Sequence, residues 1–196
     1  MECFNNENLR ALGGCRTIIK RLIISICFVA VVAIVWYLWS IQSENISVEL
    51  KGTKYRLGEK NKDFSEPVKV KVKGRLHNSI TGERKFIGTI ELEGENIPVP
   101  ADQRELNILI SKEQSGLVIY SYFEDGKAKF YNVGGLFINS DFTRVAFYLY
   151  EQQTDGGGWS GDNGIMLSAP AGNRNEALAI SKELMKNWTH APNFTQ

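Results

Sequence analysis

Cysteine is absent from most of this 196-residue chain. Its three cysteines are Cys3, Cys15 and Cys27, and none follows residue 27. A domain formed by the later residues has neither a disulfide nor a thiol nucleophile, so a packed core has to hold it together.

Histidine is also scarce, with only His77 and His190. Neither has a second histidine, a cysteine pair or a carboxylate at the spacing of a zinc site, so both are interpreted as surface residues. The chain has no long basic block of the kind that binds nucleic acid, and its formal net charge is +1. We therefore expect no metal, no cofactor and no nucleic-acid partner.

Common catalytic motifs are missing too. No GxSxG elbow occurs, and Ser160 in GGWSG lacks the required glycine spacing. The segment TDGGGWSGDNG matches neither common phosphate-binding pattern. Asp155, Asp162 and Asn163 offer oxygens to a calcium ion, but not in the register of an EF-hand. Three interpretations of this segment remain: a mobile hairpin loop, a partner-binding loop tipped by Trp159, or a calcium loop.

One long apolar run is present at residues 22–39, with the sequence LIISICFVAVVAIVWYLW. At about 1.5 Å per residue, a helix of this length measures roughly 27 Å, close to the hydrocarbon thickness of a bilayer. Aromatic residues gather at its end, where rings favour the headgroup region. No Lys or Arg follows the run before Lys51, whereas four precede it, which predicts a cytoplasmic N-terminus. These four are Arg10, Arg16, Lys20 and Arg21.

We therefore expect a single-pass protein of the cell membrane, in contact with its lipid bilayer. Residues 1–21 form a cytoplasmic tail, 22–43 a transmembrane signal-anchor helix, and 44–196 an extracytoplasmic domain on the extracellular side. The alternative, cleavage as a signal peptide after Val31 and Ala33, would place the peptidase site inside the apolar run. Lipidation of Cys15 is disfavoured because a lipobox follows its hydrophobic region and this cysteine precedes it.

The remaining chain has the patterns of a β-rich domain. In residues 68–73 three valines alternate with three lysines, which predicts a half-buried strand. Asp125-Gly126 between two apolar runs predicts a tight hairpin, and Gly134-Gly135 is expected to end one strand before the next begins. The expected strands cover residues 46–56, 68–76, 85–92, 106–110, 117–123, 127–133, 136–139, 145–150 and 165–168.

A helix is expected near the C-terminus. Asn173 and Glu176 have the spacing of a capping box. Four apolar residues then recur at helical spacing, so the helix should run from about 174 to 187; they are Ala177, Ile180, Leu184 and Trp188. The predicted fold class is α+β: an N-terminal transmembrane helix followed by an antiparallel β-meander domain with a C-terminal helix packed on the sheet.

Tyrosines provide a second candidate for binding. Tyr120 and Tyr122 share one face of their strand, and Tyr148 and Tyr150 share one face of theirs. If the two strands are neighbours, four rings line one surface that suits a sugar or a peptide. The alternative is that the fold covers these rings. The candidate partner-binding residues are Trp159, Tyr120, Tyr122, Tyr148 and Tyr150.

Charge is unevenly distributed along the domain. Residues 44–90 hold eleven Lys or Arg against six Asp or Glu, and residues 91–196 hold eight against fourteen. The basic part either faces anionic lipid headgroups or envelope polymers, or forms a solvated strand face that pairs with acidic neighbours.

The segments GGLFINSDFTRVAFYLY and GGGWSGDNGIMLSAPAGNRNEALAISKELM, within residues 134–185, resemble uncharacterised single-pass membrane-anchored proteins of Gram-positive bacteria. The placement of the apolar run adds to this resemblance. It implies an exported domain at the cell surface and transfers no functional residue to this chain.

Three functional hypotheses follow. The first is a membrane-tethered extracytoplasmic module that binds an envelope component or a protein partner. The second is a subunit of a membrane complex that associates through its transmembrane helix. The third is a membrane-bound hydrolase that uses carboxylates such as Asp141, Asp155 and Asp162, and it requires these side chains to converge in a pocket.

Overall fold

A computed structural model describes residues 6–40, 42–79, 82–153, 156–192 and 194. The chain divides into two compact units, Met1–Gln42 and Ser43–Gln196. The first contains a single helix, α1 (Asn6–Ser40). Within it, Lys20–Tyr37 is long and apolar enough to cross a membrane, and none of this window is buried. The helix ends at Ser40, three residues before the predicted end of the anchor, because Ser43 already belongs to the first strand.

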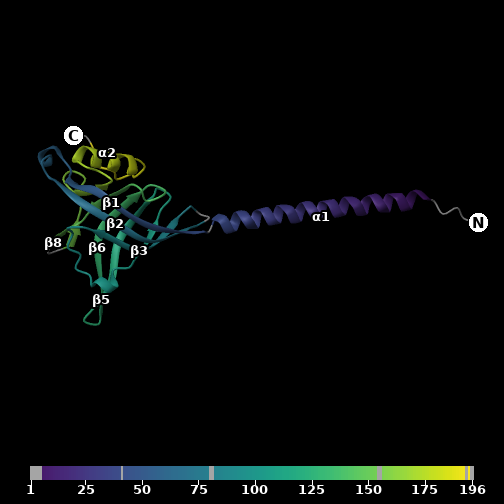
Figure 1. Ribbon diagram of the computed structural model, residues 1–196, viewed down its shortest axis with the longest axis horizontal. Helices are drawn as coiled ribbons and strands as arrows, with labels where there is room; N and C mark the ends of the chain where they lie inside the picture. Colours follow the sequence, from purple (N-terminus) through teal and green to yellow (C-terminus); the bar gives the residue numbers. More distant parts are fainter. Residues whose placement is uncertain (1–5, 41, 80–81, 154–155, 193, 195–196) are drawn as a thin grey trace, which may run out of the picture. The chain divides into compact units, whose positions relative to one another are not determined.

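The second unit is built on one eight-stranded antiparallel sheet (Figure 1). Its spatial order is β4-β3-β2-β1-β10-β7-β6-β5, so neighbours in the chain are mostly neighbours in the sheet, and the first and last strands pair with each other. The strands are β1 (Ser43–Arg56), β2 (Ser65–Asn78), β3 (Arg84–Leu92), β4 (Leu106–Ile110), β5 (Ser115–Glu124), β6 (Lys127–Ile138), β7 (Val145–Leu149) and β10 (Ile165–Ala169). The short strands β8 (Glu151–Gln153) and β9 (Gly156–Gly158) form a separate ribbon.

The sheet curls into a nearly closed barrel whose seam lies between the edge strands β4 and β5. At one end of the seam the Ser111 amide donates to the Ser115 carbonyl at 2.8 Å. Near the other end Gln103, in the short helix η2 (Ala101–Gln103), bonds both the amide and the carbonyl of Phe123. The Gln103 side chain thus substitutes for a neighbouring strand at that position and limits the exposed edge of β5.

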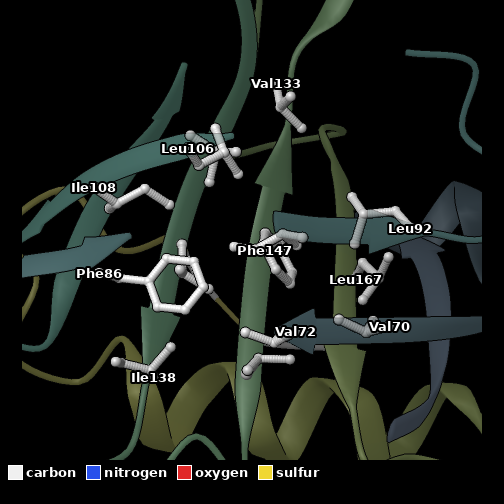
Figure 2. Packing of buried hydrophobic residues seen from close by; sticks show 14 of the residues in the cluster. Val70, Val72, Phe86, Leu92, Leu106, Ile108, Val133, Ile138, Phe147 and Leu167 are labelled. Atoms are coloured by element: carbon white, nitrogen blue, oxygen red, sulfur yellow. The ribbon is translucent and has the colours of Figure 1, made fainter. Parts of the chain in front are cut away.

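Side chains fill the inside of this barrel. The inner cluster combines residues of all eight strands, and Phe86, Leu106 and Phe147 in it are at most 1% exposed. Figure 2 shows the side chains of Val70 and Val72 on one strand in the same packed interior as Phe147 and Leu167. Barrels of eight strands have an interior that side chains can fill, and this barrel follows that rule.

A second cluster forms on the outer face of β1, β10 and β7, where the helix α2 (Arg174–Leu184) packs (Figure 1). Asn173 caps the helix by accepting from the Glu176 amide at 3.0 Å, while the Glu176 carboxylate accepts from the Gly172 amide at 2.7 Å. Below the helix, the Tyr55 hydroxyl donates to Ser181 Oγ at 2.8 Å. Both clusters consist of residues from 46 onward, so residues 43–196 contain a complete core of their own.

The α+β fold class is confirmed, but two local predictions are wrong. Gly134 and Gly135 do not separate two strands, because β6 runs through them from Lys127 to Ile138. Gly134 instead lies at an irregularity where the β5–β6 register shifts, and its φ of 142° permits the bend. The helix α2 starts at the predicted residue but ends at Leu184. The chain then forms a turn in which the Trp188 amide donates to the Met185 carbonyl.

Candidate binding surface

An exposed apolar stripe lies on the outer face of β4, β5 and β6. Among the domain residues whose side chains the structure describes, it contains every large hydrophobic residue that is exposed. Its members are Leu109 on β4, Leu117, Ile119 and Phe123 on β5, and Phe130 on β6. Phe130 is 75% exposed, Leu109 72% and Phe123 67%. Single exposed apolar residues are ordinary on protein surfaces, whereas five on three consecutive strands indicate a contact surface.

The stripe follows from the sequence of β5, which is apolar on both of its faces. In the segment LVIYSYF the even-numbered residues Val118, Tyr120 and Tyr122 point into the barrel. Because successive side chains of a strand point to opposite faces, Leu117, Ile119 and Phe123 must point outward. An antiparallel sheet with one wet face normally places polar residues at such positions.

Neighbouring residues make the surface of the stripe uneven. Ser121 lies directly opposite Phe130 in the β5–β6 register, and Ala128 lies opposite Phe123. Residues that face each other across strands in this way point to the same side of the sheet. Each protruding phenyl ring therefore stands beside a small side chain on the same face.

The charged residues at the β5–β6 turn, at one end of the stripe, balance one another. Lys129 forms an ion pair with Glu124 across the hairpin. Lys127 and Asp125, both exposed, add one charge of each sign. At the other end of the stripe, Lys85 lies directly opposite Leu109 on the same face of the sheet.

Tyr120 and Tyr122 lie inside the barrel and are unavailable as contact residues. Tyr120 is 1% exposed and its hydroxyl donates to the Ile90 carbonyl at 3.1 Å. Burial raises the pKa of Tyr120 to about 12. Tyr122 is 9% exposed in the same inner cluster. Because β6 separates β5 from β7, the predicted surface of four tyrosines does not form.

Tyr148, Tyr150 and Trp159 meet on the opposite, outer face, together with Trp188 from the segment after α2. Tyr148 stacks on Trp188, with 5.4 Å between ring centroids and 8° between planes. Its centroid also lies 5.1 Å from that of Trp159 and 5.7 Å from that of Tyr150. We call these four residues the aromatic cluster.

Within the aromatic cluster, Trp159 is folded back onto the domain and does not project from its loop. Its Nε1 donates to the Ile165 carbonyl at 3.1 Å, and its indole lies against Gly164, where a side chain would overlap it. Tyr148 is 8% exposed, and burial raises its pKa to about 12. Since the rings contact one another, they form a satellite core under α2 and leave only partly exposed edges for a ligand.

The proposed catalytic carboxylates are not brought together. Asp141 lies in the turn between β6 and β7, where it accepts from the Thr143 hydroxyl at 3.1 Å. Asp162 lies near the start of β10, which pairs with the far end of β7. Asp155 lies outside the described residues. Among the described residues, no three histidine, cysteine or carboxylate side chains are placed to hold a metal ion.

A cleft of about 360 Å³ lies between β2, β3 and the segment before β4. Several of its charged side chains already have partners within the domain. Lys69 lies 3.4 Å from Glu93, and Arg104 donates to the carbonyls of Val99 and Ile97 at 2.8 and 3.0 Å. Glu95, also in its wall, pairs with Lys54. These pairs support a role in holding the 94–105 segment against the barrel, and the apolar stripe remains the stronger binding candidate.

The stripe was missed by the sequence reasoning, although a signal existed. Both alternating residue sets of β5 are apolar, which indicates either a strand buried on two faces or a strand with an interface on one. The pattern does not say which. Comparisons with known proteins add nothing to the choice: no protein-family model, curated protein or solved structure matches this chain.

Proposed function

We propose that this protein is a membrane-tethered module whose extracytoplasmic domain binds a protein partner through the apolar stripe. The apolar window in α1 supports tethering, and the basic residues before it favour a cytoplasmic N-terminus. In this proposal the helix is an uncleaved signal-anchor of the cell membrane. The domain that follows it contributes no cysteine and fits an exported location.

The observation that carries the proposal is the exposure of the stripe. Burying an apolar side chain stabilises a folded protein by about 1.5 to 3 kcal/mol. Five exposed apolar side chains therefore leave a large stabilising free energy unused in the isolated domain. This domain buries, fully or in part, the other large apolar side chains that the structure describes, including those under α2. Exposure of only this row is best explained by a partner that covers it.

Binding by the stripe is favoured over the two other hypotheses. The carboxylates that a hydrolase would need lie at separate places among the described residues, and Asp155 lies outside them. Association through the transmembrane helix would leave the exposed stripe without a role. A module that docks through a sheet face uses both the anchor and the stripe.

Photocrosslinking of the full-length chain in membranes tests the proposal. A benzophenone amino acid is placed at Phe130 in the stripe, or at Lys182 on the exposed side of α2 as a matched control. We expect an adduct of defined mass from position 130 and none from position 182. Replacing Leu109 with serine in the position-130 variant should reduce the yield, because it removes another apolar residue of the stripe while leaving the reactive group in place.

Two outcomes would refute the proposal. One is the absence of any adduct at position 130, and the other is an equal yield at positions 130 and 182, which would indicate random collision. Mass spectrometry of the digested adduct identifies the crosslinked chain.

A further inference from the structure

We infer that the apolar stripe is covered by the stripe of a second copy of this chain. The inference rests on the proposed function, because it assigns the partner of that same surface. Three features of the stripe point to self-association: its area, the charge of its rim and its shape.

The area fits one half of a dimer interface. Two phenylalanines that are 67% and 75% exposed, with three aliphatic residues that are 40% to 72% exposed, offer roughly 300 to 550 Å² of apolar surface. A standard interface buries about 800 Å² on each partner, of which a little over half is apolar. The stripe together with the polar residues around it therefore has about the area that one copy buries in a dimer interface.

The charge of the rim permits two identical faces to meet. In a two-fold dimer each face meets its own copy, so any net charge on it would produce repulsion. At the β5–β6 end of the stripe Lys127 and Lys129 are matched by Glu124 and Asp125, so this end adds no net repulsion, and Lys85 beside Leu109 adds one positive charge at the other end.

The shape of the stripe is self-complementary. Phe130 protrudes beside Ser121, and Phe123 beside Ala128, so rings and low points alternate on one face. When two such faces meet about a two-fold axis, the rings of one copy can seat over the small residues of the other. Ser121 lies between Ile119 and Phe123 along β5 and opposite Phe130, which puts it near the centre of the stripe.

Sedimentation of residues 43–196 tests the inference without the transmembrane helix, which could otherwise associate by itself. These residues contain both core clusters and form their own compact unit. We expect a monomer–dimer equilibrium with a dissociation constant in the roughly micromolar range. Phe130→Ser and, on a different strand, Leu109→Ser should each weaken it at least ~30-fold. Lys182→Ser should leave it unchanged.

A cysteine introduced at the centre of the stripe gives an independent measurement, because residues 43–196 contain no other thiol. We expect Ser121→Cys to form a covalent dimer with a short bifunctional maleimide, and Lys182→Cys to remain monomeric. A monomeric mass at all concentrations, or equal crosslinking at both positions, would overturn the inference. If position 130 meanwhile captures an unlike protein in membranes, the proposed function stands and only its assignment to a second copy fails.

Discussion

Gly135 is the position where the smallest substitution should have a large effect. Its Cα faces the ring of Tyr148, and an added Cβ would overlap that ring. The ring cannot move freely, because it is stacked on Trp188 and also contacts Trp159 and Phe137. Gly135→Ala must therefore separate the aromatic cluster or shift the backbone of β6.

The magnitude follows from two opposing terms. Overpacking a core costs about 1 to 3 kcal/mol, and each aromatic pair that is lost costs about 0.5 to 1.5 kcal/mol. Alanine also lowers the conformational entropy of the unfolded chain, which stabilises the folded state by about 0.4 to 1 kcal/mol. We expect Gly135→Ala to lower the free energy of unfolding by about 1 to 3 kcal/mol, a large share of the stability of an ordinary domain.

Urea unfolding of residues 43–196, followed by tryptophan fluorescence, measures this change directly. The only tryptophans in this segment are Trp159 and Trp188, and both belong to the aromatic cluster. Gly158→Ala is the matched control, because an added Cβ there meets no atom within 4 Å. If the two variants have equal midpoints and emission spectra, the packing argument for Gly135 is wrong.

Two further predictions concern the polar network under α2. Ser181→Ala should destabilise the domain by about 1 to 3 kcal/mol in urea unfolding, because the Tyr55 hydroxyl and Ser168 Oγ, 2.8 and 2.6 Å from Ser181 Oγ, lose this hydrogen-bond partner. The double variant with Tyr55→Phe should lose less stability than the sum of the two single variants. Strictly additive losses would contradict this coupling. Burial raises the pKa of Tyr55 to about 12, above its unfolded value near 10, so between these values the folded state binds more protons and stability falls as pH rises. Unfolding at pH 9 to 11 should show this loss, with a shallower slope in Tyr55→Phe, and equal slopes would count against it.

Much of the local structure of this protein could be predicted from its sequence, because short-range patterns determine it. The alternation of valine and lysine at residues 68–73 became part of β2. The capping pair Asn173 and Glu176 formed as expected. Asp125 and Gly126 both adopt positive φ in the predicted hairpin turn. In each case the determining interactions lie within a few residues of one another, so no distant contact was needed to predict them.

The candidate site could not be predicted, because its formation depends on which face of each strand is buried. For β5 both faces are apolar, and only closure of the barrel places Tyr120 and Tyr122 inside and Leu117, Ile119 and Phe123 outside. The same closure separates β5 from β7 by one strand, which prevents the four tyrosines from meeting.

The sequence by itself determined the apolar helix, most of the strands of the large sheet and the C-terminal cap, since each depends on composition or short-range periodicity. Only the tertiary structure decided which apolar residues became core and which became surface. That choice is set by strand order and barrel closure, which bring together residues far apart in the chain. The same physical reason explains why Trp159 contacts Tyr148 and Trp188, and why Leu109 joins Phe130 in one stripe.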